Sequence, residues 1–164
     1  MHTRKIISVI LACLSGVPAL ATSNEAEAPY SFTLPEAWRD VSERDVIAYE
    51  SRDKSQQLTV AEYVLKKKVS AVELRSLLQR FIESRRQAEL TLSKGEATIG
   101  SPAYFAESSL IKAEYWGSRQ FAHFHSATIV WGTPNRIVSW RFEATDIAAL
   151  RETVSRVKPT IRVK

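Results

Sequence analysis

The sequence contains a single cysteine, Cys13, and it lies in an apolar segment near the N-terminus. If that segment is removed on export, the remaining chain has no thiol, which excludes thiol nucleophiles, disulfide bonds and thiolate metal sites together. Glycine is also scarce, and the four glycines outside this segment each fall at a predicted turn. They are Gly95, Gly100, Gly117 and Gly132. Because glycine-rich phosphate-binding loops are missing, we expect no nucleotide and no other cofactor.

The rest of the composition is that of an ordinary globular protein. Of 164 residues, 45% are hydrophobic and 25% are charged, which excludes a disordered, collagen-like or disulfide-scaffold chain. Without residues 1–21, the chain keeps 21 Lys and Arg against 18 Asp and Glu, a net charge of +3. These charges are mild and interspersed, so we expect no nucleic-acid partner. Residues 30–164 are long enough for a single domain with a proper core.

The N-terminus has the pattern of a cleaved export signal. Arg4 and Lys5 precede an almost wholly apolar stretch, residues 6–20. Ala19-Leu20-Ala21 then matches the small-x-small pattern of a signal-peptidase site. The apolar stretch is too short for a comfortable membrane span, and no later run could cross a bilayer. We therefore predict a signal peptide at 1–21, cleavage after Ala21, a flexible leader at 22–29, and a mature protein without a transmembrane helix in the periplasm or outside the cell.

Lipidation of Cys13 is an alternative use of the same segment. Ile10-Leu11-Ala12 loosely resembles a bacterial lipobox. That signal would have only twelve residues and would leave an apolar stretch, residues 14–21, on the mature chain. Cleavage after Ala21 is therefore the better interpretation.

Period-two patterns predict two groups of strands, with a helix between them and another at the end. The first group comprises 30–34, 46–51 and 58–65, with a turn at 52–55, and the second comprises 90–99, 103–115, 121–131 and 136–144. Ser70-Ala71-Val72-Glu73 is a capping box that predicts the start of an amphipathic helix of about five turns. A shorter helix, capped by Asp146 or Thr145, ends before Pro159.

Two predicted turns set the register of the second group. A two-residue hairpin turn at Gly117-Ser118 and a four-residue turn at 132–135 produce one nearly continuous apolar face. That face contains Tyr104, Ala106, Leu110, His125, Ile129, Trp131, Val138, Trp140 and Phe142. We therefore expect an α+β protein with a single antiparallel β-sheet, in meander, long helix, meander, helix order. The long amphipathic helix should pack on the aromatic face, and the shorter C-terminal helix should partly cover the mixed face opposite.

The pattern His123-x-His125 resembles part of a metal site, because alternate strand residues point to one face and two imidazoles can share a zinc ion. A third ligand would have to be a carboxylate. The predicted register sets Lys112 opposite His123 and sets His125 between Leu110 and Phe142. Both surroundings oppose a bound cation, so we interpret the two histidines as core residues and predict no metal site.

Catalytic groups are not singled out either. The chain has no G-x-S-x-G elbow, and its strand carboxylates show no spacing that marks an acid–base pair. Those carboxylates are Glu50, Glu62, Glu107, Glu114 and Glu143. We predict no catalytic residue and a non-enzymatic protein.

Aromatic and arginine side chains are better candidates for contacts with a partner. Trp116 and Arg119 flank the predicted hairpin turn, where an exposed tryptophan can anchor an interface. Phe105, Phe124 and Arg141 lie on the face that the shorter helix should only partly cover. These five residues are the predicted partner-binding set.

The opening motif Phe32-x-Leu34-Pro35-x-x-Trp38, followed by this order of elements, resembles the PsbP-like and DcrB-like superfamily. Members often have glycine directly before that tryptophan, whereas Ala37 stands here. The resemblance implies an antiparallel sheet between helices and work as extrinsic accessory subunits, envelope proteins, transport cofactors or chaperones. It carries over no catalytic residue, because the family has no shared catalytic set.

Three functions follow from these observations. The first is an exported accessory protein that binds a protein partner in the cell envelope, with an inhibitor or immunity-type protein as one form of it. The second is a carrier of a small apolar ligand, held between the long helix and the aromatic face beside Tyr104, Trp131 and Trp140. The third, and least favoured, is a metal-dependent hydrolase that uses His123 and His125.

Overall fold

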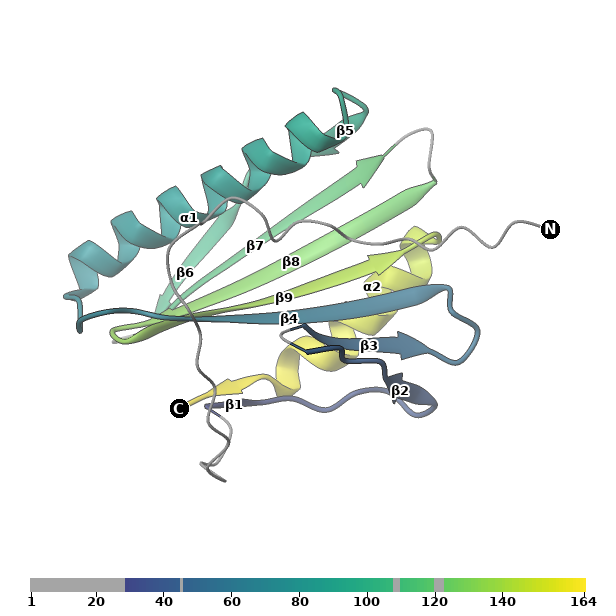
Figure 1. Cartoon of the computed structure of the whole chain (residues 1–164), viewed down its shortest axis with the longest axis horizontal. Coiled ribbons are helices and arrows are strands. Elements are labelled where there is room, and N and C mark those ends of the chain that lie inside the picture. Colours follow the sequence, from purple (N-terminus) through teal and green to yellow (C-terminus); the bar gives the residue numbers. More distant parts are fainter. Residues whose placement is uncertain (1–28, 45, 108–109, 120–122) are drawn as a thin grey trace.

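The computed structural model describes residues 29–44, 46–107, 110–119 and 123–164. The predicted signal peptide, its cleavage after Ala21 and the alternative lipid anchor at Cys13 lie outside these residues, as does the predicted leader up to residue 28. In Figure 1 a broad twisted sheet runs across the molecule, with the long helix along one side and the C-terminal helix behind its other half.

Ten strands, two α-helices and one short 3-10 helix make up the described chain. The strands are β1 (Tyr30–Ser31), β2 (Trp38–Asp40), β3 (Ile47–Ser51), β4 (Gln56–Val64), β5 (Ala97–Ile99), β6 (Ala103–Glu107), β7 (Leu110–Arg119), β8 (Phe124–Thr133), β9 (Arg136–Ala144) and β10 (Arg162–Val163). The helices are α1 (Ala71–Leu92), α2 (Ile147–Val157) and the 3-10 helix η1 (Lys158–Thr160). The predicted α+β class is confirmed. Within the described residues, none of the helices is long and apolar enough to cross a membrane.

The strands form two sheets. The larger has the order β2-β3-β4-β9-β8-β7-β5, with β6 also paired to β7, and every pairing in it is antiparallel. The smaller consists of β1 and β10, with Tyr30 opposite Val163. The prediction of a single sheet is therefore wrong. β10 has only two residues, too few to show an alternating pattern, and β1, part of the predicted 30–34 strand, pairs with β10 and does not join the larger sheet.

The two helices cover opposite faces of the larger sheet, but each covers the face predicted for the other. The aromatic face, centred on Trp140, packs against α2, and Tyr30 of β1 fills the same core. The mixed face packs against α1, where Leu74 lies with Val130 in a second core. Gly132 makes this approach feasible, because a Cβ at that position would lie 3.1 Å from Leu74 Cδ1. The number of apolar residues on each face of the sheet therefore does not determine which helix covers that face.

The start of α1 is the one that the sequence predicts. Ser70 Oγ accepts the Glu73 N–H at 3.3 Å, and the Glu73 carboxylate accepts the Ser70 N–H at 2.8 Å. The helix then runs to Leu92, through the beginning of the predicted 90–99 strand. The residues that α1 buries are Leu74, Leu78, Ile82 and Glu89. The buried stripe therefore ends in a carboxylate, which a search for apolar periodicity passes over.

Substituting Ser70 by alanine should lower the free energy of unfolding by about 1 kcal/mol, because the hydroxyl that caps the Glu73 N–H is lost. Thermal or urea unfolding of the purified protein measures this. Ser76→Ala is the matched control, since Ser76 is exposed inside the same helix and alanine is the stronger helix former there. Equal losses in the two variants would contradict a capping role for Ser70.

The strands before β8 differ most from the prediction. The expected single strand at 103–115 is a hairpin of β6 and β7, with Phe105 opposite Lys112 and Tyr104 opposite Ala113. Odd-numbered residues of β6 therefore share a face with even-numbered residues of β7. In one continuous strand, by contrast, all odd-numbered residues would share a face. The hairpin therefore exchanges the two faces of β6 relative to that prediction. As a result Phe105 lies on the aromatic face and Tyr104 on the mixed face, the reverse of the prediction.

The predicted hairpin turn at Gly117-Ser118 is also wrong. β7 continues through these residues to Arg119, which lies opposite Phe124 of β8. Gly117 sits inside the strand, where a Cβ would lie 3.0 Å from Ser126 Oγ. The glycine therefore permits a close approach of neighbouring strands and does not mark a turn.

The C-terminal part follows the prediction closely. β8 and β9 pair so that Trp131 and Val138 share the aromatic face with Trp140. Asp146 caps α2, with its Oδ1 accepting the Ala149 N–H at 2.8 Å. The predicted face of β9 and the predicted cap are both confirmed. The predicted register is wrong by two residues, because β8 extends to Thr133, which pairs with Arg136, where a four-residue turn at 132–135 was expected.

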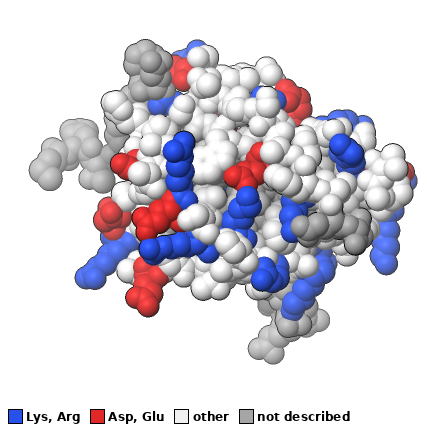
Figure 2. Space-filling view, turned by 180° about the vertical axis from the view of Figure 1, so that it is seen from behind, with Lys and Arg blue, Asp and Glu red and all other residues white. Residues whose placement is uncertain are grey.

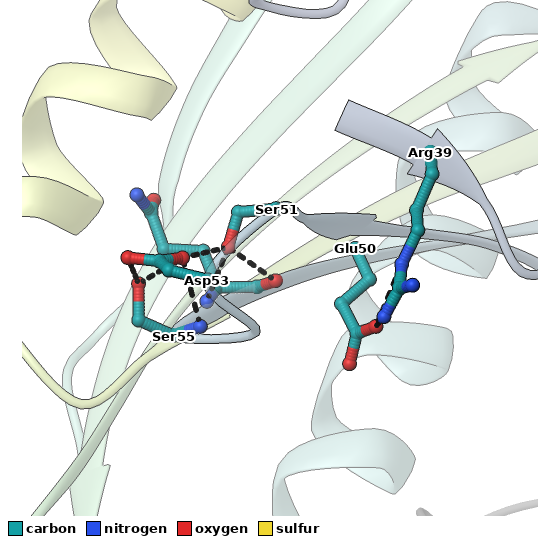
Figure 3. A network of polar contacts seen from close by, with 6 residues as sticks. Arg39, Glu50, Ser51, Asp53 and Ser55 are labelled. Atoms are coloured by element: carbon teal, nitrogen blue, oxygen red, sulfur yellow. Dashed lines mark hydrogen bonds and ion pairs between the residues drawn. The ribbon is translucent and has the colours of Figure 1, made fainter. Parts of the chain in front are cut away.

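A network of hydroxyls fixes the turn between β3 and β4 (Figure 3). Asp53 Oδ1 accepts hydrogen bonds from Ser51 Oγ at 2.7 Å and from the Ser55 N–H at 3.1 Å. These hydrogen bonds, led by the one from Ser51, lower the pKa of Asp53. Next to the turn, Arg39 Nη2 lies 2.5 Å from Glu50 Oε2 and links β2 to β3. The predicted turn at 52–55 is confirmed, and its carboxylate serves to hold that turn.

Candidate functional site

The structure separates the five residues predicted to contact a partner. Phe105 and Trp116 lie on the aromatic face of the larger sheet, on β6 and β7. Arg119, Phe124 and Arg141 lie on the mixed face, at the end that α1 covers with its last turns. The two groups cannot form one contact surface, because the sheet lies between them.

Arg141 is engaged by two carboxylates beneath α1. Its Nη1 and Nη2 each donate to the carboxylate of Glu89 at 2.8 Å, and its Nε donates to Glu143 Oε1 at 2.6 Å. Glu89 is 3% exposed, and the Arg141 side chain is 17% exposed. The prediction that Arg141 lies on a partly open sheet face is therefore wrong. The bidentate contact fastens the end of α1 to the centre of the sheet.

Burial alone would raise the pKa of Glu89, but the hydrogen bonds and positive charge of Arg141, with Arg119 and Arg85 further off, together lower it. Glu89 is therefore ionised at neutral pH, and the pair is a buried ion pair. Arg119 contributes to the same region, with its guanidinium carbon 5.7 Å from the ring centroid of Phe124. This cluster holds the end of α1 on the sheet, and Arg85 of α1 adds a further polar contact by donating to the Tyr63 hydroxyl at 2.7 Å.

Trp116 lies in the middle of β7, partly buried against the aromatic core. Its Nε1 donates to Glu114 Oε1 at 2.9 Å. The predicted location at a hairpin tip is therefore wrong, and its ring belongs in part to the fold.

The two histidines do not share a strand. His123 precedes β8 and has a positive φ of 43°, so strand alternation does not extend to it. His125 lies on the aromatic face, opposite Ser118 and Ala144, and the predicted neighbours Leu110 and Phe142 are not its partners. Lys112 lies opposite Trp131 and not opposite His123. Among the described residues, no group of three His, Cys, Asp or Glu is placed to hold a metal ion.

The predicted site for an apolar ligand does not form either. Trp131 and Trp140 lie on the aromatic face, where their ring centroids are 5.8 Å apart, whereas Tyr104 lies on the opposite face. Trp140 is fully buried among Tyr30 and other core residues. The prediction of a cavity lined by all three rings and the long helix is therefore wrong. The two tryptophans fill the core.

A groove of about 380 Å³ opens on the aromatic face between the β6–β7 hairpin and the segment η1–β10. We call it the Phe105 groove. Ile129 and Trp131 contribute its floor from β8, and Phe105, 53% exposed, stands on the β6 side. Its described lining residues are Phe105, Lys112, Ala113, Glu114, Ile129, Trp131, Ser155, Lys158, Pro159, Ile161 and Arg162. An exposed phenylalanine beside an apolar floor is a favourable feature for binding.

Positive charge surrounds the floor. Lys112 Nζ lies 4.5 Å from the ring centroid of Trp131, a cation–π contact. On the other side, Lys158 pairs with Glu114, and Arg162 Nη1 donates to the carbonyls of Pro159 and Ile161. Figure 2 shows the face of the molecule seen from behind, where basic side chains are widely spread and acidic ones lie mainly on one side.

Two polar side chains of the groove already have partners. Ser155 donates its hydroxyl to the Glu152 carbonyl within α2, and Glu114 is occupied by Trp116 and Lys158. Of its residues, only Phe105 belonged to the predicted contact set. The basic residues come from β7, η1 and β10, which meet only in the folded chain, so no local pattern marks them as a group.

The order of elements, the two sheets and the helices on opposite faces define a PsbP-like α+β fold. Among solved structures, the chain is similar to the solution structure of cyanobacterial PsbP (CyanoP) from Synechocystis sp. PCC 6803. The TM-score is 0.60 at 11% sequence identity, and the match covers 92% of this chain and 99% of that chain. The resemblance to PsbP is thus confirmed at the level of fold, and the DcrB-like part of it stays a prediction.

A crystal structure from Bacteroides thetaiotaomicron VPI-5482 also matches, at 11% identity and a TM-score of 0.47. That match covers 83% of this chain and 45% of the other. Comparison with protein-family models gives no match, and comparison with curated protein sequences gives none either.

Proposed function

We propose that this protein is an exported, non-enzymatic accessory protein that binds a protein partner in the cell envelope through the Phe105 groove. The observation that carries the proposal is the exposed ring of Phe105 beside an apolar floor ringed by lysine and arginine. A large aromatic side chain left open at the rim of a groove is a common anchor of protein interfaces. An inhibitor or immunity-type role is the form of this function in which binding is tight and one-to-one.

The PsbP-like fold supports the same proposal, since it frames the groove without supplying a catalytic set. Export rests on the sequence of residues 1–21, with its basic start, apolar stretch and small-x-small site.

A photo-crosslinking amino acid in place of Phe105 tests the proposal in intact cells of the source organism. We expect one dominant adduct of defined mass, because residue 105 lies at the rim of the groove. The matched control places the same amino acid at Arg80, which is exposed on α1, the helix that covers the other face. Absence of an adduct from position 105, or the same adducts from both positions, would overturn the proposal.

A further inference from the structure

The charge of the Phe105 groove is unbalanced. Three cationic residues line it, Lys112, Lys158 and Arg162, and Glu114 is the one acidic residue among its described lining residues. Glu114 accepts a hydrogen bond from Trp116 and forms an ion pair with Lys158, so this carboxylate offsets one of the three positive charges and the lining keeps a net positive charge. A ligand that carries carboxylates therefore complements the groove, whereas a basic ligand is repelled.

Two of the three cationic residues lie apart from the apolar part of the groove, whereas Lys112 lies over the Trp131 ring. Lys158 and Arg162 are exposed on η1 and β10, at one side. Phe105 lies on β6, at the other side of the groove. The buried Trp131 lies in the floor between β6 on one side and η1 and β10 on the other. A ligand that fills the groove should therefore present an apolar group toward Phe105 and Trp131 and a carboxylate toward Lys158 and Arg162.

We infer that the Phe105 groove binds an acidic peptide segment of the partner, in which a glutamate or aspartate adjoins a large apolar residue. The apolar side chain packs on Phe105 and Trp131, and the carboxylate pairs with Lys158 and Arg162. This inference rests on the proposed function and adds the chemistry of the partner. A volume of about 380 Å³ holds side chains of this size, and a lone inorganic anion would leave Phe105 uncovered.

Synthetic peptides test the inference on the purified full-length protein. The probe is an acetylated, amidated pentapeptide with the core Glu-Leu-Glu between two serines, and its matched counterparts have the cores Gln-Leu-Gln and Glu-Ser-Glu. Isothermal titration or fluorescence anisotropy measures the affinities. We expect the Glu-Leu-Glu peptide to bind about tenfold more tightly than either counterpart, and raising the salt concentration should weaken it.

Variants of the protein locate the contact. Lys158→Gln with Arg162→Gln should weaken binding of the Glu-Leu-Glu peptide about tenfold, and Phe105→Ala should weaken it by a similar factor. The control pair, Arg75→Gln with Arg80→Gln, makes the same charge change on exposed positions of α1 and should leave binding unchanged. Circular dichroism of each variant confirms that the fold is retained.

The outcomes separate this inference from the proposed function. Equal binding of the Glu-Leu-Glu and Gln-Leu-Gln peptides, or equal losses in the groove pair and the α1 pair, would overturn the acidic-peptide inference. If phosphate alone competes as strongly as the peptide, the groove is a small-anion site and the inference is overturned. If no peptide binds while position 105 still gives its dominant adduct in cells, the proposed function stands and the partner has another chemistry.

Discussion

Replacing Glu89 by glutamine should lower the free energy of unfolding by about 3 kcal/mol. The substitution keeps the size of the side chain but removes the charge that Arg141 faces through two hydrogen bonds of 2.8 Å. Arg141 keeps Glu143 as a partner, which limits the loss. Urea unfolding followed by circular dichroism measures the change.

Glu83→Gln is the matched control for this variant, because Glu83 is exposed on the same helix and forms an ion pair there with Arg86. We expect a change below about 0.5 kcal/mol there. If Glu89→Gln were as mild as Glu83→Gln, the buried pair would not be what fastens the end of α1.

The same ion pair should make stability depend on pH. The pKa of Glu89 is lowered in the folded protein from the ordinary value of 4.5, so the folded state holds fewer protons than the unfolded state in the acidic range. The contribution of Glu89 is therefore fully present above the unfolded pKa and is lost as the pH falls through the folded pKa. The gap in unfolding free energy between the parent protein and Glu89→Gln should shrink on acidification from about pH 7 to about pH 3. A gap that stays constant over this range would contradict an ionised Glu89.

Trp140→Ala should cost about 4 kcal/mol of unfolding free energy, since it removes the largest fully buried side chain from the core beneath α2. The indole touches both Tyr30 and Trp131, with ring centroids 5.8 Å away in each case. Its loss would thus weaken the attachment of β1 as well as the core itself. Thermal unfolding measures the effect, together with the loss of near-ultraviolet circular dichroism from the packed rings.

Trp140→Phe is the informative companion. The indole Nε1 of Trp140 is buried without a hydrogen-bond partner among the described residues, and phenylalanine removes that unsatisfied group. We expect a loss of only about 1 kcal/mol, because the lost packing is partly offset. Equal losses in the alanine and phenylalanine variants would show that ring packing is not what Trp140 contributes.

Local patterns predicted the helices well. The capping box at Ser70 and the N-cap at Asp146 are chemical signals read within four residues, and both are present in the structure. The end of α1 was harder to predict, since the stripe continues into Glu89 and the segment up to Leu92 resembles a strand by composition. Glu89 is buried because Arg141 meets it from the sheet, a partner 52 residues away in the chain.

Register and the choice of faces could not be obtained from the sequence in the same way. A hairpin at residues 103–119 and one long strand have similar alternation, but they place Phe105 on opposite faces. Gly117 favours a turn by its type, yet its neighbours across the sheet require it inside a strand. The face of Phe105 and the role of Gly117 both depend on which strands pair with each other. Strand pairing is a property of the whole fold and is not encoded in the local sequence pattern.

The candidate site was predicted least well for the same reason. Phe105 was identified as a contact residue, but on the wrong face, and the basic residues that accompany it come from three separate elements. Two of them, Lys158 and Arg162, follow α2 in a short stretch around Pro159 that has no periodic pattern. Trp116 was selected for its place beside the predicted hairpin turn and Arg141 for its place on the partly covered face, and in the structure both make contacts within the fold.

The two central strands are enclosed on both sides. Residues 126–132 of β8 are all buried, although only every second one faces a given helix, because α1 covers one face and α2 the other. A substitution anywhere along this stretch disturbs one core or the other, so the middle of the molecule has little freedom to diverge. The groove residues Phe105, Lys158 and Arg162 lie at the margins of the molecule, on β6, η1 and β10, and neither core uses their side chains. Substitutions at these three positions should therefore change the surface of the groove and leave both cores as they are.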